Sequence, residues 1–273
     1  MKSPHPYVLG HSNHEIERLQ RQAGIVDPIT RRFFREAGIV PGMRVLDVGS
    51  GAGDVSFLVA ELVERGGEVV GVDRSATAVG AANARAKAMS LAQVSFVAGD
   101  PAELAFDRPF DAVVGRFVLQ FQEDPATMLR NLVPRLGAGG VVVFHELDWG
   151  RIGSFPPAPL YEQCCRWGME TLRRHGTESR MGMKLYSTLV SAGLPSPQVR
   201  FEALFGCGAG AGIIVRWLAD FIETLLPEME RLGVASASEV GIETLAERLS
   251  RETSAGPSLI VGWDQMGAWS RIP

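Results

Sequence analysis

A glycine-rich turn and two aspartates are the residues of this 273-residue sequence whose types and spacing best suit chemistry. The turn runs from Gly49 to Gly53, within the stretch 47–53 that reads DVGSGAG. Glycines there permit positive φ angles and let a ligand contact the backbone, and the helix start that follows supplies unpaired N–H groups with a partial positive charge. Asp73 comes about twenty residues later, where an acid can accept hydrogen bonds from both hydroxyls of a ribose, and Asp100 ends the next apolar run. Together they indicate a site for a ligand that carries a ribose and a carboxylate or phosphate.

The elements that must position these residues alternate between strand and helix. Val-rich runs predict strands at 44–48, 68–72, 94–97, 110–114 and 140–147, and helical patterns predict helices near 54–65, 75–90 and 124–136. Such alternation is typical of a parallel sheet covered by helices on both faces. The glycine turn, Asp73 and Asp100 each follow a strand, so we expect them at one edge of the sheet. The alternative, that both aspartates are ordinary helix caps or turn residues, leaves their shared spacing unexplained.

Segments on both sides of this core predict further helices. Residues 11–37 show two helical patterns, the second beginning at Asp27 and Pro28, and strands near 198–205 and at 258–270 enclose a largely helical stretch with a capped helix at Ser236. We therefore expect a single domain over 1–273. Its expected parts are an N-terminal helical cap at 1–40, a cofactor-binding core at 41–150, and helical insertions at 151–180 and 207–256 that serve as a lid and substrate region.

Composition excludes several classes of protein. The 27 basic residues face 31 acidic ones, a formal charge of −4, without the basic stripe that nucleic-acid binding requires. No apolar run approaches the roughly 18 residues that span a bilayer, and nothing at the start of the sequence indicates export, so we expect a cytoplasmic protein. Three cysteines form no disulfide or zinc pattern, and His11, His14 and Glu15 lack a fourth ligand, so no metal site is expected. The oligomeric state stays open, a homodimer being one arrangement.

The glycine turn, Asp73 and Asp100 resemble the first three motifs of class I S-adenosylmethionine-dependent methyltransferases. Residues 110–117 and 132–143 are similar to the fourth and fifth motifs. Among subfamilies, the sequence most resembles the small-molecule group that includes ubiquinone and menaquinone C-methyltransferases. The resemblance implies an α/β, Rossmann-like, doubly wound sheet of seven strands, mostly parallel with an antiparallel last strand, and S-adenosyl-L-methionine as cofactor.

The resemblance also implies roles for individual residues. The glycine turn would lie against the methionine part of the cofactor, Asp73 would hold the ribose, Asp100 the adenine amino group, and Arg116 would flank the methionine end. The expected cofactor-binding residues are Asp47, Gly49, Ser50, Gly51, Gly53, Asp73, Arg74, Asp100, Pro101 and Arg116. A nicotinamide dinucleotide fits less well, because G-x-G-x-x-G would place glycine where Asp54 stands, and a negative charge there would repel a pyrophosphate.

Catalysis of methyl transfer depends mainly on alignment and on exclusion of water, with a base where the acceptor needs one. His145, near the end of the strand at 140–147, is the candidate base, since its ordinary pKa near 6.5 suits neutral operation. A histidine hydrogen-bonded into the sheet end is an equally good interpretation, and Glu146 has the same ambiguity. The Asn/Asp-Pro-Pro-aromatic signature of amine methylation is missing after residue 114, which argues against nucleobase or glutamine N-methylation.

The substrate region is expected to hold a small, apolar or aromatic acceptor. Its candidate walls, which are more often core residues, are Trp167, Trp217, Phe221, Leu225 and Leu226. The glycine cluster at 206–212 predicts a hinge for a mobile cover formed by 7–37 and 207–256, with Tyr7 and Gln22 nearest the cofactor. A second hypothesis is a cofactor-binding protein of the same fold without methylating activity, either a sensor or a pericyclase- or decarboxylase-like catalyst, because fold alone does not fix function.

Overall fold

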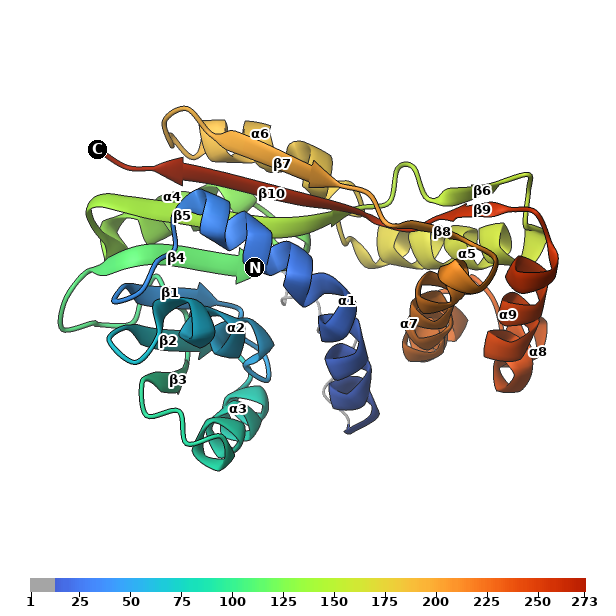
Figure 1. Ribbon diagram of the computed structural model, residues 1–273, viewed down its shortest axis with the longest axis horizontal. Helices are drawn as coiled ribbons and strands as arrows, with labels where there is room; N and C mark the ends of the chain where they lie inside the picture. Colours follow the sequence, from blue (N-terminus) through green and yellow to red (C-terminus); the bar gives the residue numbers. More distant parts are fainter. Residues whose placement is uncertain (1–12) are drawn as a thin grey trace. The chain divides into compact units, whose positions relative to one another are not determined.

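The computed structural model describes residues 13–273, with the backbone alone described for residues 13–23 and for Ala255 (Figure 1). The first half of the chain forms α1 (Asn13–Ala37), β1 (Arg44–Val48), α2 (Asp54–Val63), β2 (Glu68–Asp73), α3 (Ala76–Ala88), β3 (Val94–Ala98), β4 (Phe110–Arg116), the 3₁₀ turn η1 (Leu119–Phe121), α4 (Pro125–Leu132), η2 (Val133–Arg135) and β5 (Leu136–Asp148). The second half forms β6 (Gly153–Phe155), α5 (Pro159–His175), α6 (Met181–Ser191), β7 (Gln198–Glu202), β8 (Phe205–Cys207), η3 (Gly208–Ala211), α7 (Gly212–Arg231), α8 (Ala237–Val240), η4 (Ile242–Thr244), α9 (Leu245–Ala255), β9 (Leu259–Val261) and β10 (Asp264–Arg271).

Seven of the described strands form one sheet in the order β3-β2-β1-β4-β5-β10-β7. β1 pairs in parallel with β2 and β4, β2 with β3, and β4 with β5. The arrow of β10 points against those of β4 and β7 in Figure 1. The predicted α/β, Rossmann-like sheet of mostly parallel strands with an antiparallel last strand is confirmed.

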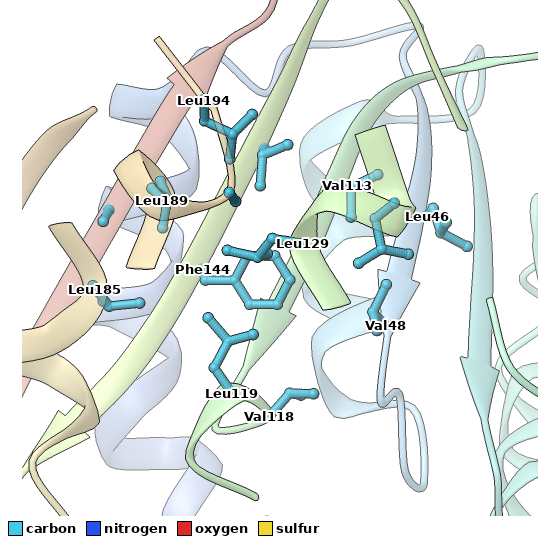
Figure 2. Close-up of a cluster of buried hydrophobic side chains, with 14 of the residues drawn as sticks. Leu46, Val48, Val113, Val118, Leu119, Leu129, Phe144, Leu185, Leu189 and Leu194 are labelled. Carbon is cyan, nitrogen blue, oxygen red and sulfur yellow. The ribbon is translucent and has the colours of Figure 1, made fainter. Parts of the chain in front are cut away.

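Helices cover both faces of this sheet because its strands are apolar on both sides. Leu46 of β1 and Phe144 of β5 belong to a buried cluster with Leu129 of α4 and Leu185 of α6 (Figure 2). Residue 47 of β1 points to the opposite face, where the Asp47 carboxylate accepts a hydrogen bond from Ser56 of α2. Side chains alternate along β1, so the buried cluster lies on the sheet face covered by α4 and α6. Asp47 lies on the other face, beside α2.

The chain divides into two compact units, which are described separately. One holds Val26–Glu146, Met181–Phe201 and Met266–Pro273, and contains the body of the seven-stranded sheet. The other holds Leu147–Arg180, Glu202–Gln265 and the first half of α1 up to Ile25, and contains an antiparallel sheet in the order β6-β9-β8. Its core includes a cluster of Trp149, Trp217, Phe221 and Trp263, with the Trp217 and Trp263 rings 4.1 Å apart. The expected insertions at 151–180 and 207–256 belong to this second unit, while the division at residues 40 and 150 stays a prediction.

Several element boundaries differ from those that the sequence patterns predict. The predicted pair of helices at 11–37 is one helix, α1, which continues through Pro28. The Asp27 carboxylate accepts a hydrogen bond from Arg116 and so does not cap a new helix, and the Thr30 hydroxyl donates to the Val26 carbonyl one turn back. The predicted final strand divides into β9 and β10 around Gly262, whose N–H donates to the Leu204 carbonyl at 2.8 Å.

The capping box at Ser236 and Glu239 is present, as predicted, but the helix it begins is short. α8 ends at Gly241, which has a left-handed φ of 60°, and the chain starts again as η4 and α9. In the described part of the chain, no helix is both long and apolar enough to cross a membrane.

Candidate cofactor-binding site

The glycine turn lies between β1 and α2 and has one side open. Its three glycines have positive φ angles, 69° at Gly49, 52° at Gly51 and 96° at Gly53. A Cβ added at Gly49 would lie 2.7 Å from a methyl of Val118, whereas one added at Gly51 would meet nothing within 4 Å. Gly49 therefore gives room for a neighbouring side chain, and Gly51 exposes its backbone to a ligand.

Asp73 joins the end of β2 to this turn. Its Oδ2 accepts the Gly51 N–H at 2.9 Å, and its Oδ1 accepts the Ser75 N–H at 2.8 Å. An ionised carboxylate has about four lone-pair positions, so each oxygen can accept a further hydrogen bond from a ribose hydroxyl. The structure thus brings together two of the residues that the sequence pattern predicted to share a site.

Asp100, after β3, is held in its ionised form. Arg74 donates to its Oδ2 at 2.9 Å, and the N–H of Ala102 donates to its Oδ1 at 2.9 Å. Partial burial raises the pKa of Asp100, but the hydrogen bonds from Ala102 and Arg74 outweigh it and the pKa is lowered. Arg74 and Pro101, also predicted here, flank this carboxylate in the loops after β2 and β3.

Two buried polar atoms beside the glycine turn have no hydrogen-bond partner among the described residues. One is Oδ1 of Asp47, whose Oδ2 accepts the Ser56 hydroxyl at 2.5 Å, and the other is Oγ of Ser50. Burial raises the pKa of Asp47 to about 7, against the lowering effects of Ser56 and Arg116. A buried polar group without a partner costs about 1–3 kcal/mol. These atoms fit a ligand that brings a hydrogen-bond donor, such as an ammonium group.

Arg116, at the end of β4, is engaged by α1. Its Nη1 donates to Asp27 at 2.6 Å and to Thr30 Oγ1 at 3.1 Å, and the side chain is 9% exposed. The sequence pattern predicted Asp27 only as a helix cap, and this ion pair is a further contact of its carboxylate. No local signal could have revealed it, because the two residues are 89 positions apart.

Asp54, whose charge was expected to repel a pyrophosphate, forms an ion pair with Arg85 of α3 at 2.7 Å. Arg85 therefore compensates much of the negative charge at the start of α2, and Asp54 would repel a dinucleotide less than the sequence indicates. The open Gly51 and the partnerless Asp47 oxygen carry the assignment instead.

His145 is wholly buried rather than open to a substrate. Its ring lies between those of Phe33 and Phe117, with centroids 4.9 and 5.2 Å away, and its Nδ1 is 3.0 Å from Thr30 Oγ1. Because the Thr30 proton is donated to the Val26 carbonyl, Nδ1 carries the hydrogen in the His145–Thr30 bond. This packing favours the structural interpretation of His145, and its role as a base stays a prediction.

The candidate acceptor walls lie mainly in the core of their own unit. Trp217 and Phe221 belong to the aromatic cluster around Trp263, and Leu225 is fully buried. In the predicted hinge, a Cβ on Gly206 would lie 2.4 Å from the Gly210 carbonyl oxygen, so close backbone packing accounts for that glycine. Tyr7 and the side chain of Gln22 lie outside the described part of the structure, as do His11 and the side chains of His14 and Glu15.

The glycine turn and its aspartates lie in a part of the chain that matches a known protein family. A family model described as a methyltransferase domain matches residues 39–181, more than half of the chain. The chain belongs to this methyltransferase-domain family. The match runs from the loop before β1 to the start of α6, and so contains every residue predicted to bind the cofactor.

Relatives of this methyltransferase-domain chain agree with that assignment. It is 38% identical over 125 residues to the 2-phytyl-1,4-naphtoquinone methyltransferase of Synechococcus elongatus, a match covering 45% of this chain and 51% of the relative. The chain thus spans about half the length of this curated relative.

Two solved structures have the same fold. One is the YcgJ protein of Bacillus subtilis, with a TM-score of 0.57 and 18% identity over 92% of this chain and 99% of that one. The other is phosphoethanolamine N-methyltransferase 2 of Haemonchus contortus in complex with S-adenosyl-L-methionine, with a TM-score of 0.55 and 20% identity over 93% of this chain and 52% of that one.

Proposed function

We propose that this chain is an S-adenosylmethionine-dependent methyltransferase that acts on a small molecule. The observation that carries the proposal is the juxtaposition of the open Gly51 backbone, the Asp73 carboxylate bound to it, and the partnerless Oδ1 of the buried Asp47. An amino-acid group linked to a ribose would satisfy all three, and S-adenosylmethionine carries both parts.

The residues present fit this cofactor. Asp47 and Ser50 would accept from its ammonium group, the open space at Gly51 would let the ligand approach the turn, Asp73 would bind the ribose hydroxyls, and Asp100 would accept from the adenine amine. When bound, the cofactor supplies an electrophilic methyl group on a sulfonium. The protein then has to orient the acceptor and exclude water, which are the main sources of rate enhancement in such a displacement.

A small and largely apolar acceptor is the substrate class that we propose. One of the relatives is named for methylation of a naphthoquinone, and the chain carries slightly more acidic than basic residues, 31 against 27. A surface of that balance disfavours phosphate-rich partners. By the same reasoning we propose that nucleic acid is not the substrate. We also propose a cytoplasmic enzyme, a location in which the three free cysteines would stay reduced.

The acceptor does not depend on His145 as a base in this proposal. A carbon or amine nucleophile needs little acid–base help, and the imidazole is packed between two phenyl rings with Nδ1 on Thr30. His145 then orders the contact between α1 and β5 in the sheet-containing unit.

Titration calorimetry on the full chain tests the cofactor assignment. S-adenosylmethionine and S-adenosylhomocysteine are expected to bind, and a nicotinamide dinucleotide is expected to bind much more weakly or not at all. Tighter binding of the dinucleotide would contradict the proposal.

A further inference from the structure

The segment that follows β4 has a strained and well-defined backbone. Phe117 has a φ of 59°, which is unusual for a bulky residue, and Val118 and Leu119 lead directly into the 3₁₀ turn η1. Such conformations persist only where surrounding contacts hold them, and they concentrate at functional sites. Residues 117–119 are called the β4 turn below.

A carboxyl group on the neighbouring strand holds this turn. Oε1 of Glu146, near the end of β5, accepts the N–H of Val118 at 2.8 Å and the N–H of Leu119 at 2.7 Å. These are amides at the start of η1, which receives no side-chain cap from its own sequence. Glu146 of β5 therefore caps the start of η1 from outside that turn.

The β4 turn in turn forms one wall of the glycine turn. Val118 contacts Gly49 so closely that a Cβ on that glycine would lie 2.7 Å from its nearer methyl. Val118 and Leu119 lie at one end of the buried cluster, and Leu194 lies toward the other end (Figure 2). A displacement of the β4 turn would thus move the side chain that packs on the cofactor-binding loop.

A carboxyl group is a costly way to fill this position. Glu146 is fully buried, its Oε2 has no partner among the described residues, and burial raises its pKa to about 8. An apolar side chain would avoid that desolvation but would leave two backbone amides unsatisfied. What the carboxyl group provides is a fixed β4 turn.

We propose that Glu146 is a positioning residue for cofactor binding, which it supports by holding Val118 of the β4 turn against Gly49. This inference rests on the proposed function, since it assumes that the glycine turn binds S-adenosylmethionine. Glu146 itself makes no contact with the cofactor in this account. It acts through two backbone hydrogen bonds and one side-chain contact.

Calorimetry with S-adenosylhomocysteine as the probe tests the inference on the full chain. Glu146→Leu is expected to weaken binding at least tenfold, because it removes the carboxyl oxygen that accepts both amides. Glu146→Gln should recover most of that loss, since its amide oxygen can accept the same two hydrogen bonds. Rescue by glutamine distinguishes a positioned acceptor from a side chain that merely fills space.

The matched control is Leu189→Ala on α6, which belongs to the same buried cluster but lies outside the β4 turn. It should lower the melting temperature and leave the affinity for the probe unchanged. Wild-type affinity in folded Glu146→Leu, or an equal loss of affinity in Leu189→Ala, would overturn the inference.

If Glu146→Leu does not fold, the affinity of Val118→Ala for the probe tests the inference instead. It leaves Glu146 in place and removes the methyl groups that pack on Gly49, so affinity for the probe should fall several-fold. Unchanged affinity in that variant would overturn the inference. Failure of the wild-type protein to bind the probe at all would instead count against the proposed function.

Discussion

The Asp73 carboxylate accepts the Gly51 N–H at 2.9 Å and so fixes the open side of the glycine turn to the end of β2. The same carboxylate accepts the N–H of Ser75 at the start of α3. One side chain therefore organises two loops at the edge of the sheet. It also keeps acceptor capacity on both of its oxygens for a ligand.

Asp73→Ala should weaken S-adenosylhomocysteine binding by about 10- to 150-fold, because a charge-assisted hydrogen bond contributes about 1.5–3 kcal/mol. The matched control is Asp124→Ala, which also removes an aspartate that caps a helix, here by accepting the Thr127 N–H at 2.9 Å at the start of α4. Calorimetry on both variants should show a loss only for Asp73→Ala. Equal affinity in the two variants would reduce Asp73 to a capping residue.

The pH dependence of cofactor affinity should report on Asp47. Its pKa is raised to about 7, chiefly by burial, so in the free protein it is largely protonated at pH 5.5. Pairing with a cationic ammonium requires the ionised form, so affinity should rise between pH 5.5 and 7. Asp47→Asn should bind more weakly and show a flatter profile, and a wild-type profile without this rise would contradict the pairing.

The contribution of Asp47 to the stability of the fold should change with pH in the direction opposite to cofactor affinity. A pKa that is higher in the folded than in the unfolded protein means that the folded state keeps the proton longer. The contribution of Asp47 to stability is therefore greatest below about pH 4 and is lost as the pH rises to about 7. Melting curves of wild type and Asp47→Asn without ligand should show this change in their difference.

The Arg116–Asp27 pair is expected to be a genuine stabilising contact, because Arg116 is 9% exposed and Asp27 33% exposed. A double-mutant cycle with Arg116→Met and Asp27→Ala should give a coupling free energy of about 1–2 kcal/mol, above the 0.2–1 kcal/mol typical of exposed pairs. The control is the cycle on Arg31 and Glu61, whose side chains are 29% and 64% exposed. Equal coupling free energies in both cycles would show that the Arg116–Asp27 pair contributes no more than an exposed pair to the attachment of α1 to β4.

Local spacing was enough to predict the glycine turn, Asp73 and Asp100, because parallel strands bring their carboxyl ends to one edge of the sheet whatever the rest of the fold does. The contacts of Arg116 with Asp27 and of His145 with Thr30 join residues 89 and 115 positions apart, and no pattern along the chain encodes such pairs. The sequence therefore left two interpretations of His145 open, a base and a histidine hydrogen-bonded into the sheet end, and its burial favours the second.

The three-stranded sheet was also beyond sequence patterning. β6, β8 and β9 have three residues each, which is too short for alternation of apolar and polar side chains to stand out. β9 was absorbed into the longer predicted strand at 258–270, and only Phe205 of β8 falls within the predicted strand at 198–205. Pro28 led to the opposite error, since it predicted the start of a second helix at a point where α1 continues without a break.

A cofactor-dependent cover remains a prediction for the helical segments at 7–37 and 207–256. Hydrogen exchange with and without S-adenosylhomocysteine measures it, and both segments should gain protection when the ligand is bound. α4, which lies under the sheet, provides the internal reference. Equal exchange in the two states would show a static helical coat that only completes the core.

Transfer of a labelled methyl group tests the central claim most directly. The purified protein is incubated with methyl-labelled S-adenosylmethionine and a metabolite extract, with Asp73→Ala as the matched control. We predict label in a small, apolar product that forms with wild type and falls sharply with the variant. Cofactor binding without label in any small molecule, or label found only in nucleic acid or protein, would contradict the account.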